Sequence, residues 1–239
     1  MSTTAQRTLV WDLPTRAFHW LLALAFAGAY ATSESERLRD VHMLLGYTAF
    51  GLVGFRLLWG VVGTRYARFT ALPLSPAAVL DYLKSLPTRS PRHYFGHNPA
   101  GSWAIVFMLL LVVALGATGW AQAVEVGPKW LEDLHEGLAN TMLALVAVHV
   151  AAVLLSSALH RENLPRAMLT GYKPGAGPGA AGSRWAVALL LVGLIGAFWA
   201  GAIPAPGIEA GRSLVQAAVQ QGVPAGAARA QRRHRHDDD

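Results

Sequence analysis

The sequence predicts an all-α integral membrane protein, built as a bundle of four transmembrane helices with a fifth transmembrane helix appended. Hydrophobic residues make up 53% of the 239-residue chain and charged residues only 14%, whereas soluble domains carry about 25% charged residues. The apolar residues gather in five segments, each close to the roughly 20 residues that a helix needs to cross a bilayer. None of them alternates polar and apolar residues, and backbone groups in lipid must be paired within their own structure, so each segment is expected to be a helix.

The first four expected spans are joined by two short connections and one long one. In chain order, the five spans are expected at about residues 14–32, 41–62, 101–124, 131–159 and 184–203. In the long connection, residues 75–86 start with Ser-Pro and have apolar residues at helical spacing, which predicts a short amphipathic helix on the membrane surface. The Gly- and Pro-rich residues 173–183 predict a flexible linker. We therefore expect a four-helix domain over residues 1–175, and over residues 176–239 the linker, the fifth helix and a basic, disordered tail.

Lys and Arg are distributed unevenly between the two sides of this expected bundle. Connections 63–100 and 160–183 are basic, whereas connection 33–40 balances two arginines with three acidic residues. By the positive-inside rule, the N-terminus and the basic connections lie in the cytoplasm, although the arginines after residue 203 then fall on the outer side. The formal net charge of +6 is explained by contact with anionic membrane lipid, and no nucleic-acid partner is expected.

The absence of cysteine limits the redox chemistry that the chain can support. It excludes disulfide bonds, thiolate-bound iron–sulfur clusters, thiolate zinc sites and covalently attached c-type haem. Histidine is then the main candidate ligand inside the expected spans.

Four histidines lie within apolar segments: His19, His42, His135 and His149. An ionisable residue in a membrane span is costly and needs a functional reason. His135 and His149 are fourteen residues apart in the fourth span, which on a helix is a rise of about 21 Å and a rotation close to four full turns. Both imidazoles therefore point from one face of that helix, at two different depths.

Depth sorts the four histidines into two pairs. His19 and His149 are expected on the cytoplasmic side, and His42 and His135 on the outer side. Zinc usually takes three or four protein ligands, whereas haem iron needs only two, because the porphyrin fills its other four positions. Two histidines at each of two levels therefore predict two b-type haems with bis-histidine ligation. Iron with both axial positions filled favours electron transfer over oxygen binding or activation. The alternative is that His42 and His135, near span ends, are interfacial residues.

Five stretches of the chain carry a resemblance to a known family. They are RAFHWLLA (16–23), HMLLGYTAFGLVGFRLLWG (42–60), GHNPAGSW (96–103), HEGLANTMLALVAVH (135–149) and RENLPRAMLTGYKPG (161–175). Together they resemble the bacterial cytochrome b561 and nickel–iron hydrogenase cytochrome b family, in the same order over about residues 8–175. The resemblance implies a multi-pass protein of the bacterial inner membrane that holds two haems b at positions matching the four histidines. It also implies electron exchange between the quinone pool and a redox partner.

Two arginines and two loop histidines are further candidates. Arg56 follows His42 by fourteen residues on the same helix face, near the cytoplasmic end, and Arg16 lies near the start of the first span. Either arginine could pair with a propionate of the cytoplasmic haem, or simply extend its charge to the membrane surface. His93 and His97 of the long connection could transfer protons to a quinone. We expect instead that both are solvated loop residues.

The most direct interpretation is a di-haem electron carrier of respiratory electron transport, which passes electrons between the quinone pool and a redox protein such as a c-type cytochrome. Three alternatives stay open. The chain could be the haem-bearing membrane anchor of a hydrogenase or another dehydrogenase, or an enzyme that oxidises superoxide and reduces quinone. It could also be a metal-ion transporter that uses intramembrane histidines. The sequence leaves open whether the chain works as a monomer or a homodimer.

Overall fold

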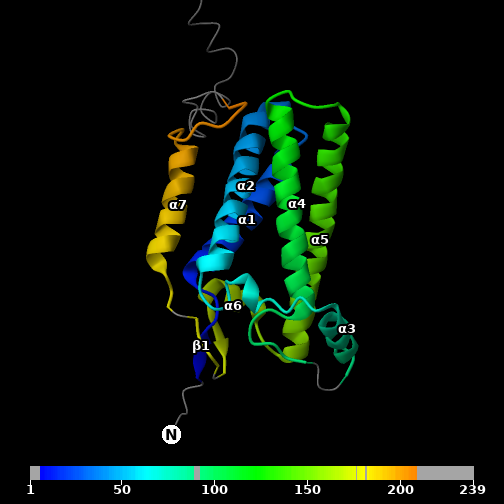
Figure 1. Ribbon diagram of the computed structural model, residues 1–239, viewed down its shortest axis with the longest axis vertical. Helices are drawn as coiled ribbons and strands as arrows, with labels where there is room; N and C mark the ends of the chain where they lie inside the picture. The colour runs from blue at the N-terminus through cyan, green and yellow to red at the C-terminus, as the bar shows by residue number, and fades with distance from the viewer. Residues whose placement is uncertain (1–5, 89–91, 176, 181, 209–239) are drawn as a thin grey trace, which may run out of the picture.

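The computed structural model describes residues 6–88, 92–175, 177–180 and 182–208. Four long helices form the body of the molecule: α1 (Leu13–Thr32), α2 (Arg39–Val62), α4 (Pro99–Ala123) and α5 (Trp130–His160). A fifth apolar helix, α7 (Trp185–Trp199), runs beside α1 and α2 (Figure 1). All five lie where the sequence predicted spans, but α7 is five residues shorter than the segment expected at 184–203. The tail that we expected to be basic and disordered falls mostly outside the described residues.

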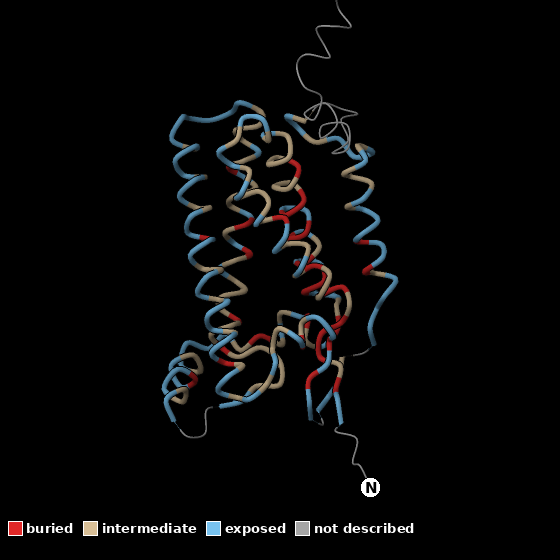
Figure 2. Tube along the Cα trace, turned by 180° about the vertical axis from the view of Figure 1, so that it is seen from behind, coloured by how far each residue is buried: buried red, intermediate tan, exposed pale blue. Residues whose placement is uncertain are grey.

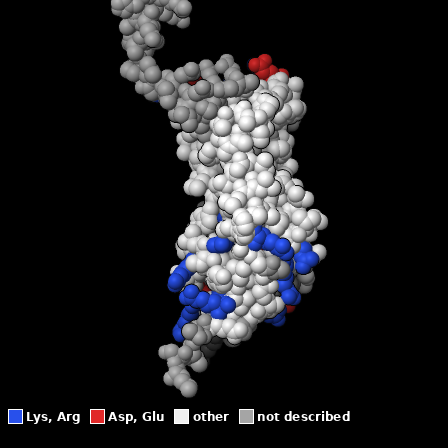
Figure 3. All heavy atoms as spheres, turned by 90° about the vertical axis from the view of Figure 1, so that its left-hand side faces the viewer, with Lys and Arg blue, Asp and Glu red and all other residues white. Residues whose placement is uncertain are grey.

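The short elements gather at one end of the bundle, together with the start of the chain (Figure 1). They include α3 (Pro76–Ser85), α6 (Leu164–Thr170) and the 3₁₀ turn η2 (Phe69–Ala71), whereas the 3₁₀ turn η1 (Glu36–Leu38) joins α1 to α2. The helix α3 confirms the amphipathic helix expected over residues 75–86. On the face shown in Figure 3, Lys and Arg side chains form a band at this end, and the long middle region is almost entirely uncharged. This distribution agrees with the positive-inside rule.

By length and composition, three helical segments of the described chain can cross a membrane: Glu36–Val62, Pro99–Ala123 and Trp130–His160. The first of them consists of η1 and α2 together. The helix α7 has 15 residues and is about 22 Å long, shorter than the hydrocarbon core of about 30 Å. Three of the described helices are thus long and apolar enough to span a membrane, and the count of four spans plus one stays a prediction.

A two-stranded antiparallel sheet corrects the all-helical expectation. The strand β1 (Arg7–Leu9) pairs with β2 (Tyr172–Pro174), with Thr8 opposite Lys173. The linker expected to begin at Lys173 therefore begins later, because this residue lies in β2 and its side chain is buried. The sheet ties the start of the chain to the segment that follows the fourth long helix.

Polar caps explain where two of the long helices begin. Asp12 caps α1 by accepting a hydrogen bond from the backbone N–H of Thr15 at 2.8 Å. Asn98 caps α4 in the same way, accepting from Gly101 N–H at 2.7 Å, and Pro99 occupies the first turn, where a missing N–H has no cost. These caps fix the positions of the residues just before each helix, Trp11 and His97.

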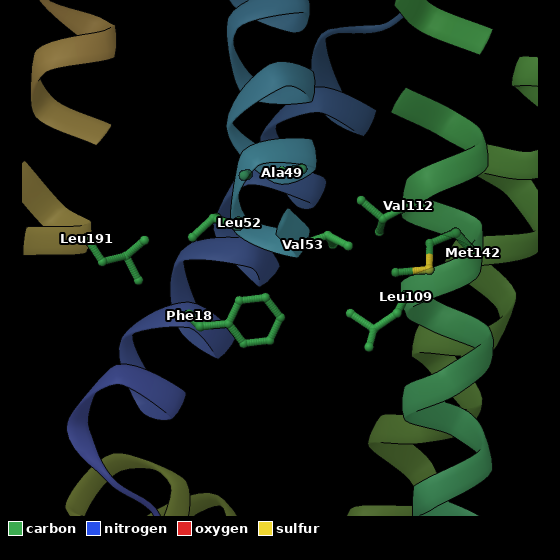
Figure 4. Packing of buried hydrophobic residues seen from close by; sticks show 9 residues of the cluster. Phe18, Ala49, Leu52, Val53, Leu109, Val112, Met142 and Leu191 are labelled. Atoms are coloured by element: carbon green, nitrogen blue, oxygen red, sulfur yellow. The ribbon is translucent and has the colours of Figure 1, made fainter. Parts of the chain in front are cut away.

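The apolar core joins all five helices, and lipid-compatible side chains cover the outside. Figure 4 shows Phe18 and Val53 pointing toward Leu109 and Val112 across the middle of the bundle, with Leu191 of α7 on the opposite side. The outward sides of the helices are exposed (Figure 2), and many of the exposed residues are large and apolar. Such a surface is typical of a protein that lipid surrounds.

The bundle consists of two tightly packed helix pairs. α1 packs along α2, α4 packs along α5, and α2 also contacts α4. Among the described residues, α1 and α5 have no comparable backbone packing, and Tyr30 of α1 reaches α5 by donating to Asn140 Oδ1 at 2.8 Å. His19 of α1 and His149 of α5 lie on the two helices that border this looser side of the bundle.

Candidate functional site

His42 and His135 face each other at the end of the bundle away from the sheet. His42 lies in the first turn of α2 and His135 in the second turn of α5. Their ring centroids are 6.3 Å apart, and the ring planes are inclined by 70°. Two imidazole–metal bonds of about 2 Å in line, plus the distance from each nitrogen to its ring centre, add up to about 6 Å. The spacing therefore suits one metal atom between the two rings.

A backbone carbonyl orients the His42 ring. His42 Nδ1 lies 2.8 Å from the carbonyl oxygen of Ala29 in α1. A carbonyl can only accept, so Nδ1 carries the proton and donates it. The other nitrogen, Nε2, then has a free lone pair, and this is the tautomer in which a histidine binds metal through Nε2.

A threonine orients the His135 ring in the same sense. His135 Nδ1 lies 2.8 Å from the hydroxyl oxygen of Thr118 in α4. That hydroxyl also lies 2.9 Å from the carbonyl of Ala114 and 3.1 Å from that of Leu115. Its single proton goes to a carbonyl, so its oxygen accepts the Nδ1 proton of His135. The Nε2 atoms of both rings are thereby left free.

Gly119 permits the close approach of α4 to this ring. A Cβ atom on Gly119 would lie 3.2 Å from His135 Cε1, which is closer than side chains normally pack. Sequence reasoning found neither Gly119 nor Thr118. The only sequence signal for Thr118 is a hydroxyl residue inside an otherwise apolar span, which is too common to identify a partner of histidine.

His19 and His149 form the second pair, toward the end that carries the sheet. His19 of α1 and His149 of α5 are close enough for their charges to interact. The Nδ1 atom of His19 is buried and has no hydrogen-bond partner. The two pairs thus differ, because neighbouring groups already orient both rings of the His42–His135 pair.

Arg56 lies buried near the second pair. Only 3% of the residue is exposed, its guanidinium carbon lies 4.9 Å from the centroid of the Phe69 ring, and it interacts electrostatically with Asp12. Its Nη1 atom is buried without a partner. Arg56 therefore does not extend to the membrane surface, which was one of its two expected roles.

The Asp12 carboxylate is engaged on both oxygens. One oxygen caps α1, and the other accepts from Trp59 Nε1 at 3.1 Å and from Thr64 Oγ1 at 2.6 Å. Arg16, the second candidate arginine, donates from Nη1 to the carbonyl of Leu169, and its Nε atom is buried and unpartnered. Both arginines therefore keep a buried donor available.

The two loop histidines differ from each other, which corrects the expectation that both are solvated. The side chain of His93 is 44% exposed and lies 2.8 Å from Glu162 Oε1. His97, by contrast, packs against Trp11 with ring centroids 4.6 Å apart, and its Nδ1 is buried without a partner. Burial lowers the pKa of His97 to about 3, and the charges of Arg56, Lys173 and His149 act in the same direction, so this imidazole is neutral at physiological pH.

The chemistry of the donor set limits what the histidine pairs can hold. Among the residues that the structure describes, no group of three or more His, Cys, Asp or Glu side chains could hold a metal ion. Zinc sites of the usual kind need such a group. A metal whose other positions are filled by a cofactor needs only the two imidazoles that each level provides.

Comparison with known proteins gives two matches. A family model described as prokaryotic cytochrome b561 matches residues 10–171. A curated protein of Cupriavidus necator, named "Probable Ni/Fe-hydrogenase B-type cytochrome subunit", is 25% identical in an alignment that covers 70% of this chain and 86% of that protein. No solved structure matches this chain.

Proposed function

The chain belongs to the prokaryotic cytochrome b561 family, and from this premise we propose that it is a di-haem electron carrier of the bacterial inner membrane, with its N-terminus in the cytoplasm. A membrane-embedded helical bundle that transfers electrons through haem b is what the family as a whole provides. The finer assignment is ours: His42 and His135 bind the iron of an outer haem, and His19 and His149 bind the iron of an inner haem.

The single observation that carries the proposal is the outer pair. Its rings face each other at 6.3 Å, and both Nδ1 atoms are already hydrogen bonded. Histidines that merely anchor helix ends at the membrane interface do not require such an arrangement. A haem bound here supplies reversible one-electron transfer. The carbonyl of Ala29 and the hydroxyl of Thr118 hold the two rings in the orientation for ligation.

The inner pair fits the same cofactor by a different observation. Arg56 and Arg16 each keep a buried, unpartnered N–H close to the inner end, and a haem propionate is a carboxylate that such donors bind. His135 and His149 are about 21 Å apart along α5, so the two pairs lie toward opposite ends of the bundle.

Quinone is the proposed electron-exchange partner at one haem, and a redox protein such as a c-type cytochrome is the proposed partner at the other. The test is an optical difference spectrum of the purified, oxidised chain, reduced first with a quinol analogue and then fully with dithionite. The proposal predicts a b-type spectrum and substantial reduction by the quinol. A colourless chain, even when it is expressed with ample haem, would contradict it.

A second candidate is a haem-bearing membrane subunit of a hydrogenase or another dehydrogenase. The relative from Cupriavidus necator favours it, because its name describes a hydrogenase cytochrome subunit. Mild detergent extraction followed by tagged purification separates the two candidates. A stoichiometric catalytic subunit would support the second, whereas a chain that purifies alone and reacts with quinol supports the first. The alternative of an enzyme that oxidises superoxide is disfavoured by the acidic Glu132 and Asp133 in the first turn of α5, close to His135.

A further inference from the structure

Five buried side-chain nitrogen and oxygen atoms of the described residues have no hydrogen-bond partner, and they lie toward the same end of the bundle. They are Thr15 Oγ1, Arg16 Nε, His19 Nδ1, Arg56 Nη1 and His97 Nδ1. A buried polar atom without a partner is costly, and native proteins contain few of them. Their concentration in one region indicates that this region receives a polar group from outside the chain.

The unpartnered atoms come from three separate segments: the start of α1, the second half of α2, and the loop before α4. Contacts connect the three. His97 packs on Trp11, which is next to Asp12, and it interacts electrostatically with Arg56 and with His149. Arg56 in turn interacts with Asp12. The buried, unpartnered nitrogens of Arg56 and His97 therefore lie in one region, close to His149.

The chemistry of these atoms specifies the missing group. Arginine nitrogens can only donate, and the Nδ1 of a neutral histidine can donate as well. The nearby carboxylate of Asp12 is engaged with Thr15, Trp59 and Thr64. Glu162 binds His93 and Lys173. An additional carboxylate is the group that the free donors would bind.

We propose that His97 is a haem-positioning residue, which donates from Nδ1 to a propionate of the inner haem next to the guanidinium of Arg56. The proposal rests on the proposed function, because it needs a haem between His19 and His149. It assigns a role to the loop before α4, in which the Asn98 cap and Pro99 fix the backbone and the Trp11 ring fixes the plane of the imidazole.

The experiment compares three variants of the full-length, haem-loaded protein by redox titration and by the rate of haem transfer to apomyoglobin. His97→Phe keeps a ring against Trp11 but removes the donor, and His97→Asn keeps an N–H near the position of Nδ1. His93→Phe is the matched control, because it makes the same change in the same loop at a half-exposed side chain.

In His97→Phe we expect a lower midpoint potential for one haem only, because a less neutralised propionate stabilises ferric iron. We also expect roughly tenfold faster loss of that haem, the factor for one charge-assisted hydrogen bond. His97→Asn should restore both values, and His93→Phe should change neither. Equal effects of the Phe and Asn variants, or a shift of both haems, would show that His97 acts only through packing and would overturn the proposal.

The wild-type protein provides a second test that does not depend on how well a variant folds. Reconstitution with the dimethyl ester of haem removes the carboxylates, so the inner site should retain the ester less well than haem. Equal retention at both sites would overturn the propionate assignment. If the wild type binds no haem at all, the proposed function fails. If it binds two haems and His97→Phe behaves like the wild type, only the present inference fails.

Discussion

Thr118 of α4 accepts the Nδ1 proton of His135 of α5 at 2.8 Å, so a neighbouring helix decides which nitrogen of this histidine is free. The carbonyl oxygen of Ala29 accepts the Nδ1 proton of His42 in the same way. In both cases the orienting group comes from the helix packed next to the one that carries the histidine. The tight packing of α1 on α2 and of α4 on α5 therefore also fixes the orientation of the His42 and His135 rings.

Replacing Thr118 by Val should weaken the outer haem site without changing the shape of α4. Valine fills the same volume but cannot accept the Nδ1 proton, so the ring loses its fixed orientation and becomes a weaker electron donor to iron. Loss of such a partner typically costs 10- to 100-fold in affinity. Redox titration should show a raised midpoint potential for one haem only.

Thr141→Val is the control for this change. The Thr141 hydroxyl donates only to Gly137 of its own helix, at 2.7 Å, on an exposed part of α5. Its removal should leave both haems unchanged. If Thr118→Val also leaves both potentials and both haem contents unchanged, Thr118 does not orient a ligand.

Gly119→Leu should displace His135. A side chain at this position starts 3.2 Å from the imidazole, so the ring must move and the outer haem should be lost while the inner haem stays. The control is Gly137→Leu, because a Cβ on Gly137 meets no atom within 4 Å. Absorbance per milligram of purified protein measures both variants, and full haem content in Gly119→Leu would contradict the prediction.

The positions of the helices and the approach of His42 to His135 were accessible from the sequence for a simple reason. Long apolar runs such as residues 99–123 have one stable structure in lipid, and residue number gives depth along a helix. The sheet that pairs Thr8 with Lys173 was missed, because three-residue strands far apart in the sequence leave no periodic pattern. The burial of His97 was missed for a related reason, since it depends on a contact with Trp11 from another part of the chain.

Asp12→Asn should destabilise the end of the bundle that carries the sheet. The carboxylate accepts from Thr15, Trp59 and Thr64 and faces the buried Arg56. An amide retains one acceptor oxygen and removes the charge opposite the guanidinium. We expect a loss of about 1–3 kcal/mol in the free energy of unfolding, measured by thermal denaturation in detergent.

Asp81→Asn is the matched control for charge and chemistry. Asp81 pairs with Arg92 at 3.4 Å, and both side chains are more than half exposed. Exposed ion pairs contribute little to stability, so this variant should denature at the wild-type temperature. Equal destabilisation by the two substitutions would show that the buried network around Asp12 contributes no more to stability than the exposed pair of Asp81 and Arg92.

The buried Lys173 makes the stability of the folded protein depend on pH. Burial lowers the pKa of Lys173 from its usual value of 10.5, with Glu162 acting in the opposite direction. The folded protein therefore releases this proton at a lower pH than the unfolded chain does. The unfolded chain binds more protons in that interval, so stability increases as the pH rises toward 10.5.

The test compares the wild type with Lys173→Met, which cannot titrate at this position. The difference in denaturation temperature should change in favour of the wild type as the pH is raised above neutrality. A difference that stays constant from neutral pH to the pKa of free lysine would show that the pKa of Lys173 is not lowered in the folded protein.

The central claim, that two pairs of histidines hold two haems, is tested most directly by measuring haem per polypeptide in the four single variants His19→Ala, His42→Ala, His135→Ala and His149→Ala. The pyridine haemochrome assay should give two haems for the wild type and one for each variant. His19→Ala and His149→Ala should lose the same haem, identified by its midpoint potential, and the other two variants should lose the other haem. A folded wild type with one haem or none, or loss of both haems in equal measure from every variant, would contradict the claim.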